Sequence, residues 1–327
     1  MKRPFPSSPC VAALALAACA LSGAAGAQTY PDKPIHMVVP FAPGGGTDTV
    51  VRIIGPRLGA ALGQPIVADY KPGAGTLIGT EFTAHAPPDG YTLLIGSASH
   101  ALNPSLHVKV NYHPTRDFQA ISMAVTFPFI LAVTNSLAVN NVKELIALAK
   151  KEPGTLGYGT AGLGSTPNLA GEVFKTMTGT DLIHVPFKGG GPSLTAAIGG
   201  QVPVLFGTAV ETLPQAKAGK IRGLAVSSAK RSAAAPEMPT IAEAGVPGYD
   251  VTGWYVILAP AGTPKPIVDR LNAELVKVLR MPEVKAQMLN TATEAWATTP
   301  AEAQDFVGRE TTRWAQVIKK AGIQPES

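Results

Sequence analysis

Four short segments of the chain combine glycine with small polar residues, the residue types that bring backbone amides and hydroxyls close to an anion. These segments are 41–48, 96–100, 159–166 and 186–191. Each follows an apolar run typical of a strand, and most precede a helical pattern. Glycine lets the backbone approach a ligand, and a helix N-terminus presents unpaired N–H groups. Any one loop could simply form a tight turn, but four together predict a binding cleft at the carboxyl ends of strands.

Backbone amides alone can hold a carboxylate in such a cleft. Charge-assisted hydrogen bonds contribute about 1.5–3 kcal/mol each. Four or five of them exceed the roughly 8 kcal/mol that corresponds to micromolar affinity, before the free energy lost on association is subtracted. The cleft therefore needs no arginine or lysine for an acidic ligand.

A serine hydrolase is the alternative that the same loops leave open. Ser97 and Ser165 both follow strands, and either could act as a nucleophile with His100 or His184 as its base. That chemistry also needs an acid to orient the base, and the spacing shows no such arrangement. Each serine is more simply interpreted as a hydrogen-bonding residue at a strand end.

Residues 157–162 match the Gly-x-Gly-x-x-Gly pattern of dinucleotide-binding loops, with Asp181 19 residues after the last pattern glycine. A dinucleotide fold requires a strand before the first glycine and the acidic residue at the end of the next strand. Here the preceding strand is only about 155–156, and Asp181 comes before the strand expected at 182–186. The pattern therefore favours a turn over a nicotinamide site.

Apolar runs and helical repeats alternate along the chain, which is typical of an α/β protein. Strands are expected at 35–41, 91–95, 129–133, 182–186, 203–206, 221–226 and about 252–259. The first helix is expected to have Thr47 or Asp48 as its N-cap and to be kinked at Pro56. Further helix caps are expected at Asn141, Thr166, Thr263 and Thr299. No flexible linker is visible, so two domains would be joined by strands.

Length and composition limit the classes of protein that remain. A chain of 327 residues predicts about two domains, and 46% hydrophobic against 15% charged residues excludes disorder. The formal charge is +5; residues 1–27 hold two basic and no acidic residues, leaving 25 against 22, or +3. Without a basic cluster this charge argues against nucleic acid. The six histidines form no His-x₃-His pair, so neither a metal site nor a cofactor is expected.

The first 27 residues have the pattern of a Sec-type export signal. Lys2 and Arg3 precede the apolar run 11–20, which is too short to span a bilayer, and 25–27 offer a small-x-small cleavage site. The alternative is a lipobox that would leave Cys19 lipidated. Both cysteines precede residue 28, so the mature chain is expected to fold without disulfides in the periplasm.

An ordered set of motifs covers nearly the whole mature chain. It comprises Tyr-Pro-x-Lys-Pro-Ile (30–35), Val-Val-Pro-Phe-Ala-Pro-Gly-Gly (38–45), Lys-Pro-Gly-Ala-Gly (71–75), Pro-Asp-Gly-Tyr-Thr-Leu-Leu (88–94), His-Val-Pro-Phe-Lys-Gly (184–189), Gly-Gly-Gln-Val (199–202), Gly-Trp (253–254) and Ala-Pro-Ala-Gly-Thr-Pro (259–264). This set resembles the solute-binding receptors of tripartite tricarboxylate transporters, the Bug-type family.

The resemblance implies a type II periplasmic binding protein, two α/β lobes that close on a ligand like a Venus flytrap, each with a mostly parallel sheet flanked by helices. Lobe 1 would comprise 28–127 and 252–327, and lobe 2 would comprise 128–251. Such a receptor is a monomer without enzymatic activity. It passes a small carboxylated solute to membrane permease subunits, although a sensor that addresses a membrane kinase is a possible alternative.

The same resemblance implies a set of ligand contacts. They are Phe41, Gly44, Gly45, Thr47, Asp48, Ser97 and His100 in lobe 1, and Thr160, Ala161, Gly162, Ser165 and Asn168 in lobe 2. Asp48 could equally cap the helix, and Trp254 could belong to the core or to the cleft. Three positions depart from the family pattern, because Asn168, Phe187 and Ala196 replace a common His, Tyr and Asp. These changes make lobe 2 less polar and favour a ligand with an apolar or aromatic portion.

Overall fold

The computed structural model describes residues 30–320, so the expected export signal and both cysteines lie outside the described residues. The strands are β1 Ile35–Val39, β2 Ile66–Tyr70, β3 Thr92–Ser97, β4 Phe118–Val133, β5 Gly157–Thr160, β6 Ile183–Pro186, β7 Val204–Thr208, β8 Arg222–Val226, β9 Thr252–Pro260 and β10 Glu294–Ala295. The helices are α2 Gly46–Leu62, α3 Leu77–Ala84, α4 Ala98–Leu106, α5 Val142–Lys151, α6 Thr166–Thr178, α7 Gly190–Ile198, α8 Ala209–Lys217, α9 Lys265–Arg280, α10 Pro282–Leu289 and α11 Pro300–Lys320.

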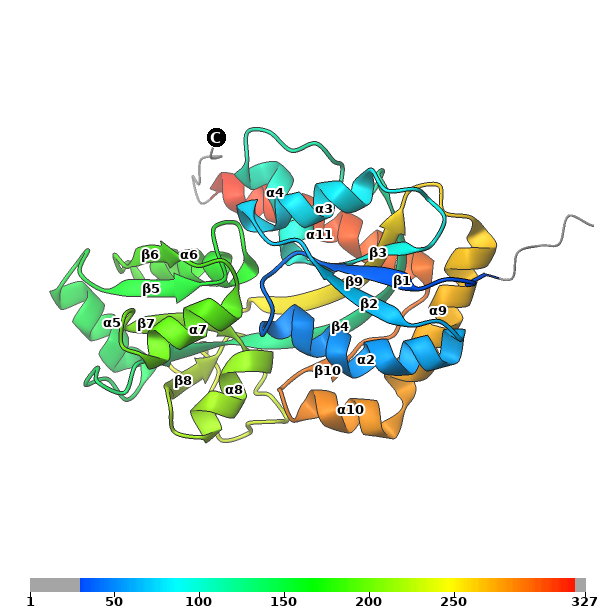
Figure 1. Ribbon diagram of the computed structural model, residues 1–327. Coiled ribbons are helices and arrows are strands. Elements are labelled where there is room, and N and C mark those ends of the chain that lie inside the picture. The colour runs from blue at the N-terminus through cyan, green and yellow to red at the C-terminus, as the bar shows by residue number, and fades with distance from the viewer. Residues whose placement is uncertain (1–29, 321–327) are drawn as a thin grey trace, which may run out of the picture.

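The strands form two lobes with the same order of strands. In one lobe the order is β2-β1-β3-β9-β4, with β1, β2 and β3 parallel and β9 antiparallel to β3. In the other the order is β6-β5-β7-β4-β8, with β5, β6 and β7 parallel and β4 antiparallel to both neighbours. Each lobe is thus a mostly parallel α/β sheet in which one antiparallel strand arrives from the other lobe (Figure 1).

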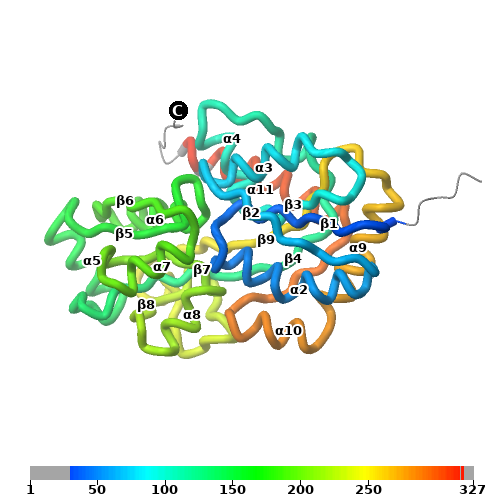
Figure 2. Tube along the Cα trace, in the orientation of Figure 1, coloured from blue at the N-terminus to red at the C-terminus, as the bar shows by residue number. Residues whose placement is uncertain are grey.

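The long strand β4 belongs to both sheets. Its residues up to Pro128 pair with β9, and from Phe129 onward they pair with β7. Figure 2 shows β4 and β9 running together between the two halves of the molecule. Both strands are almost entirely buried, so apolar residues continue from one lobe to the other through the connection.

Ser227 connects β4 to the segment before β9 in the second lobe. Its hydroxyl accepts a hydrogen bond from the Phe129 amide at 2.7 Å and donates one to the Val251 carbonyl at 2.5 Å. Its own amide donates to Phe129, and its carbonyl accepts from the Val251 amide, each at 2.9 Å. This fully buried serine therefore links β4 to the segment that leads into β9.

The C-terminal helix α11 is held against the first lobe by a shared carboxylate. Trp254 of β9 and Trp314 of α11 both donate their indole N–H groups to Oε2 of Glu310, at 3.2 and 2.8 Å. All three side chains are buried. The chain therefore returns to its starting lobe after passing through the other one.

Two of the expected helix caps are confirmed. The Asn141 side chain accepts from the Glu144 amide at 2.9 Å and starts α5. At α11, the Thr299 amide donates to Glu302 at 2.8 Å and the Glu302 amide donates back to the Thr299 hydroxyl at 3.2 Å. This reciprocal pair is a capping box.

The other expected caps are wrong by one to three residues. At α6 the cap is Ser165, whose hydroxyl accepts from the Asn168 amide, so Thr166 is already helical. At α9 the cap is Pro264, one residue after Thr263. At α2 the cap is Gly45, which places Thr47 and Asp48 in the first turn. The helix α2 also continues through Pro56 to Leu62; the proline is exposed, so water can bind the carbonyl that it leaves without a partner.

We expect Ser227→Ala to lower the free energy of unfolding by about 1–3 kcal/mol, because the buried Phe129 amide and Val251 carbonyl would each lose a hydrogen bond. Urea unfolding followed by tryptophan fluorescence measures the change. The neighbouring Ser228 bonds only to the Lys230 carbonyl in an exposed turn, so Ser228→Ala should change the value by less than about 0.5 kcal/mol. Equal losses in the two variants would contradict the role given to Ser227.

Candidate ligand-binding site

A narrow cavity, partly open to solvent, lies where the carboxyl ends of the parallel strands of the two lobes face each other. Its lining residues are Phe41, Gly45, Gly46, Thr47, Ser97, Ser99, Phe127, Phe129, Ala161, Thr166, Pro167, Gly190, Thr208, Glu211, Trp254 and Tyr255.

The fold explains why these residues meet. The parallel strands β1, β3, β5, β6 and β7 lead into the helices α2, α4, α6, α7 and α8, without an intervening loop after β3 and β7. Every one of these strand-to-helix junctions reaches the cavity. The N-termini of five helices therefore converge on one place, which is favourable for negative charge. The two crossing strands add aromatic residues, Phe127 and Phe129 from β4 and Trp254 and Tyr255 from β9.

Four buried polar atoms of the cavity have no hydrogen-bond partner among the described residues. They are Thr47 Oγ1, Ser99 Oγ, Thr208 Oγ1 and Glu211 Oε2. The first two come from one lobe and the last two from the other. Buried polar groups are usually hydrogen-bonded, so a group of four without partners in one cavity is typical of atoms that a ligand or ordered water completes.

Glu211 is the one charged side chain among the described residues of the lining. Burial raises its pKa to about 7, partly opposed by the hydroxyl and amide of Thr208 and the amide of Gly46. A Cβ atom at Gly190 would overlap the Glu211 carboxyl group, so this glycine leaves the room that the side chain occupies. Glu211 therefore lies against the N-termini of both α2 and α7.

Five of the contacts expected from the sequence line the cavity, namely Phe41, Gly45, Thr47, Ser97 and Ala161. Two others, Gly44 and Asp48, shape the first loop. The Gly44 amide donates to Asp48 Oδ2 at 2.8 Å, while Asp48 Oδ1 accepts from Arg52 at 2.9 Å and from the Tyr70 hydroxyl at 2.6 Å. Asp48 thus holds the loop that carries Phe41 and Gly45 rather than lining the cavity itself.

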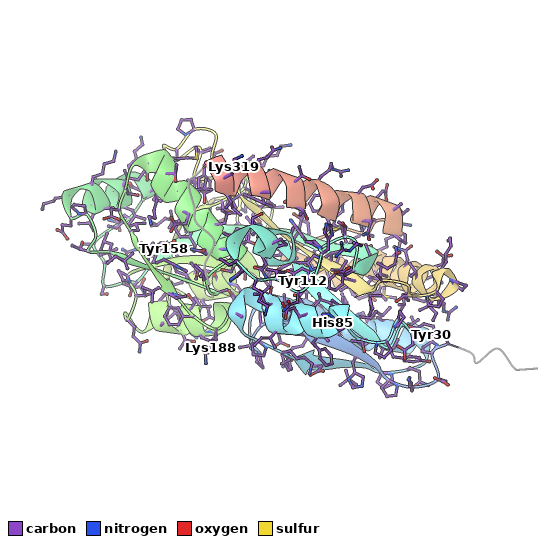
Figure 3. All side chains as sticks on the ribbon, turned by 90° about the horizontal axis from the view of Figure 1, so that it is seen from above. Tyr30, His85, Tyr112, Tyr158, Lys188 and Lys319 are labelled. Carbon is purple, nitrogen blue, oxygen red and sulfur yellow. The ribbon has the colours of Figure 1, made fainter. Side chains whose placement is uncertain are left out.

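The remaining expected residues of the second lobe shape the loop between β5 and α6. The Thr160 hydroxyl accepts from the Gly162 amide at 3.2 Å and lies 2.7 Å from Nε2 of His184. The Ser165 hydroxyl donates to the Gly162 carbonyl at 2.6 Å. Asn168 accepts from the Gly164 amide and donates to the hydroxyl of Tyr158, which Figure 3 shows within this lobe. These contacts place Ala161 and Thr166 at the cavity.

His100 lies apart from the cavity. Its Nε2 is 2.8 Å from the Pro114 carbonyl, and its ring packs against Tyr112 and Phe118. Burial lowers its pKa to about 4, so it is neutral at physiological pH. His184 contacts Thr160 rather than Ser165, and neither Ser97 nor Ser165 has a histidine partner within residues 30–320. The described residues therefore do not form the pair that a serine hydrolase needs.

Sequence reasoning missed the junction between β7 and α8, which supplies Thr208 and Glu211, and the aromatic residues Phe127, Phe129 and Tyr255. A signal for the junction was present, because 203–206 was an expected strand and the next residues begin a helix. It contains just one glycine, Gly207, inside β7, so a search for glycine-rich loops passes over it.

The three departures from the family pattern lie outside the cavity lining. Phe187 and Ala196 border a separate surface hollow with Pro43 and Gln201, and Asn168 is used inside its loop. Lys188 is exposed and is also absent from the lining. The apolar character of the site therefore comes from the aromatic residues of β4, β9 and the first loop.

The dinucleotide-like glycines are used for packing. Gly157 and Gly159 lie within β5, and a Cβ at Gly159 would come within 2.8 Å of the Ser193 hydroxyl on α7. Both are strand residues, and Gly159 allows α7 to pack closely, so these two glycines do not form a loop around a pyrophosphate.

The fold and the cavity define a two-lobed periplasmic binding protein, a class in which a solute binds between the lobes. Within that class the chain belongs to the tripartite tricarboxylate transporter receptor family, whose model matches residues 50–323. Protein BugT of Bordetella pertussis is 34% identical over 311 residues, which is 94% of this chain and 95% of BugT.

Two solved structures of Rhodopseudomonas palustris proteins show the same fold. Rpa4515 with adipate has a TM-score of 0.88 and 38% identity, covering 91% of this chain and 100% of that protein. MatC with bound malate has a TM-score of 0.84 and 31% identity, covering 88% and 100%. These relatives are solute-binding proteins rather than enzymes, as expected for this chain. In residues 30–320, no helix is long and apolar enough to cross a membrane.

We expect Asp48→Asn to lower the free energy of unfolding at pH 7 by about 1–3 kcal/mol, because the charged acceptor of three hydrogen bonds is lost. Burial by itself would raise the pKa of Asp48, but bonds from Tyr70, Gly44 and Arg52 hold it below its usual range. The ionised form therefore stabilises the fold above about pH 4, and this stabilisation is lost as the pH falls through the lowered pKa.

Urea unfolding at a series of pH values tests this expectation. The difference between wild type and Asp48→Asn should shrink once the wild-type carboxylate is protonated. The control is Asp305→Asn at an exposed position of α11, which should have little effect at any pH. A difference that stays constant from pH 7 down to the lowest pH at which the protein folds would contradict the assignment.

Glu211→Gln should have the opposite effect on stability and raise the free energy of unfolding at high pH. The raised pKa of Glu211 means that its contribution to stability is complete below about pH 4.5 and is lost as the pH rises through about 7. The neutral variant should therefore be more stable than wild type at pH 8, by ~3 kcal/mol, and close to it near pH 5. Thermal unfolding at both pH values measures this, with Glu283→Gln, in the exposed first turn of α10, as the control. An equal difference at the two pH values would show that Glu211 does not titrate between them.

Proposed function

We propose that this protein captures a small carboxylated solute between its lobes in the periplasm and delivers it to the membrane permease subunits of a tripartite tricarboxylate-type transporter. The observation that carries the proposal is the cavity with four partnerless polar atoms, two from each lobe. A ligand that bonds to both pairs stabilises the closed arrangement of the lobes, because the same contacts cannot be made when the lobes separate.

The electrostatics of the cavity favour a carboxylate. Helix N-termini from both lobes reach the cavity, and the hydroxyls of Thr47, Ser99 and Thr208 add donors. No lysine, arginine or histidine occurs among the described lining residues. The relatives solved with adipate and malate support this ligand class.

The aromatic residues favour a ligand with an apolar portion. Phe41, Phe127, Phe129, Trp254 and Tyr255 all contribute to the lining. A hydrocarbon chain or ring that covers this surface removes it from water, which stabilises the complex by about 25 cal/mol per Å² of apolar area buried. A carboxylate with an aliphatic or aromatic body thus uses both parts of the site, whereas citrate offers polar groups on every side.

The proposed division of the chain follows the crossing strands. Lobe 1 would hold 28–127 and 252–327, and lobe 2 would hold 128–251. The pairing of β4 changes between Pro128 and Phe129, and β9 begins at Thr252, which supports these boundaries. Export by the signal at 1–27 and action as a monomer complete the proposal.

Calorimetric titration tests the ligand class with adipate, malate, hexanoate, benzoate and citrate. At least one of the acids with an apolar portion should bind, and Thr47→Val should weaken it about 10- to 100-fold by removing a hydrogen bond to a charged group. Thr312→Val, at an exposed site of α11, is the matched control and should bind as wild type does. Uptake of the same acid by cells lacking this chain should return with the control and not with Thr47→Val.

Three results would each overturn a part of the proposal. Tight binding of citrate with no binding of the other acids would defeat the apolar portion of the ligand. Absence of binding by any carboxylate would defeat the ligand class itself. Binding without any effect of the chain on uptake would remove the transport role and leave a receptor for another membrane partner.

A further inference from the structure

Glu211 is an unusual group to find in a cavity that favours anions. Its side chain is 8% exposed, and Oε2 has no hydrogen-bond partner within residues 30–320. That oxygen lies 3.6 Å from the position that a Cβ of Gly45 would take, so it faces the first loop of the opposite lobe. A ligand carboxylate placed beside it would meet a like charge whenever Glu211 is ionised.

A purely structural role accounts for only part of this arrangement. Thr208 and Glu211 have the spacing of a capping box, in which the glutamate turns back to the amide of the cap residue. Both the hydroxyl and the amide of Thr208 do lower the pKa of Glu211. However, the Thr208 hydroxyl caps no amide of α8, and Thr208 Oγ1 and Glu211 Oε2 both have no hydrogen-bond partner in the described structure, so the capping box is incomplete.

Within residues 30–320, the groups around Glu211 supply no cation. From α2 it faces the Gly46 amide, from α7 the Gly190 backbone, from β7 the Thr208 hydroxyl and from β9 the hydroxyl of Tyr255. Burial raises the pKa of the Tyr255 hydroxyl, so it stays neutral. An ionised Glu211 therefore gains most from a hydrogen-bond donor that enters with the ligand.

We propose that Glu211 determines ligand specificity by accepting a hydrogen bond from a hydroxyl or ammonium group that the bound carboxylate carries at a distance from its acid group. This inference rests on the proposed function, since it concerns the same cavity. The ligand carboxylate is held by helix amides, its body by the aromatic residues, and its donor group by Oε2 of Glu211.

The selection should depend on pH. A donor-bearing ligand binds the ionised form of Glu211, which rises from about a tenth to about nine tenths of the molecules between pH 6 and pH 8 for a pKa near 7. Its affinity should therefore rise about tenfold over that range. A plain carboxylate favours the protonated form and should bind more weakly as the pH rises. The ratio of the two affinities thus increases with pH.

Matched pairs of acids provide the test. Calorimetry at pH 6 and pH 8 compares hexanoate with 6-aminohexanoate and benzoate with 4-hydroxybenzoate, together with adipate as a reference. The proteins are the full chain after removal of residues 1–27, its Glu211→Gln variant, and Glu283→Gln as the control. Because each ratio is measured within one protein, a change in stability alone does not move it.

In wild type and in the control, at least one pair should favour the donor-bearing member, with a ratio at least about tenfold larger at pH 8 than at pH 6. In Glu211→Gln the ratio should be smaller at pH 8 and should not change with pH. Ratios that are the same in all three proteins, while some carboxylate still binds, would overturn this inference and leave the proposed function intact. If no carboxylate binds wild type at either pH, both proposals fail together.

Discussion

The pairing of β4 with β9 is the constraint on which the rest of the molecule depends. In the first lobe β9 is the antiparallel strand beside β3, and in the second lobe β4 is the antiparallel strand beside β7. Because β4 and β9 also pair with each other, the sheets of the two lobes are joined. Ser227 holds this crossing through four hydrogen bonds to Phe129 and Val251. Because the connection is a pair of strands rather than a flexible tether, it holds the carboxyl ends of both sheets toward one cavity.

The same crossing gives the cavity its mixed chemistry. The parallel strands contribute helix N-termini and hydroxyls, and the crossing strands contribute aromatic rings. A ligand therefore meets donors on the sides and an apolar surface along β4 and β9. Some polar residues support the lining without contacting the cavity. The Asp48 carboxylate accepts a hydrogen bond from the Gly44 amide of the first loop and is held in place by Arg52 and Tyr70.

The sequence predicts the α/β class, most strands and the glycine-rich junctions well, since these depend on local patterns. It fails where long-range packing decides. The strand β2 is half-buried at a sheet edge and shows only a short apolar run, and the first half of β4 was not expected at all. The cap of α2 is Gly45 rather than Asp48, because the Asp48 carboxylate accepts hydrogen bonds from the Gly44 amide and the Tyr70 hydroxyl. Tyr70 is 22 residues away in the sequence, so local patterns do not reveal this contact. His100 was expected at the cleft, yet its ring contacts Pro114 and Phe118. This orientation depends on packing in the core and is not visible in the local sequence.

Glu211 shows why the most informative residue of the site escaped sequence analysis. On its own, Thr208-Ala-Val-Glu211 indicates an ordinary helix start, and nothing local reveals that the carboxyl group will be enclosed by α2 and α7 from two directions. Enclosure without a cation makes the ionised side chain costly, and a neutral glutamine of the same shape would avoid that cost. A capping role does not require this burial, because the exposed Glu302 forms a complete capping box at α11. An energetically unfavourable group at the meeting point of two lobes is consistent with a demand from binding, since a donor on the ligand would relieve the penalty only when the lobes enclose it.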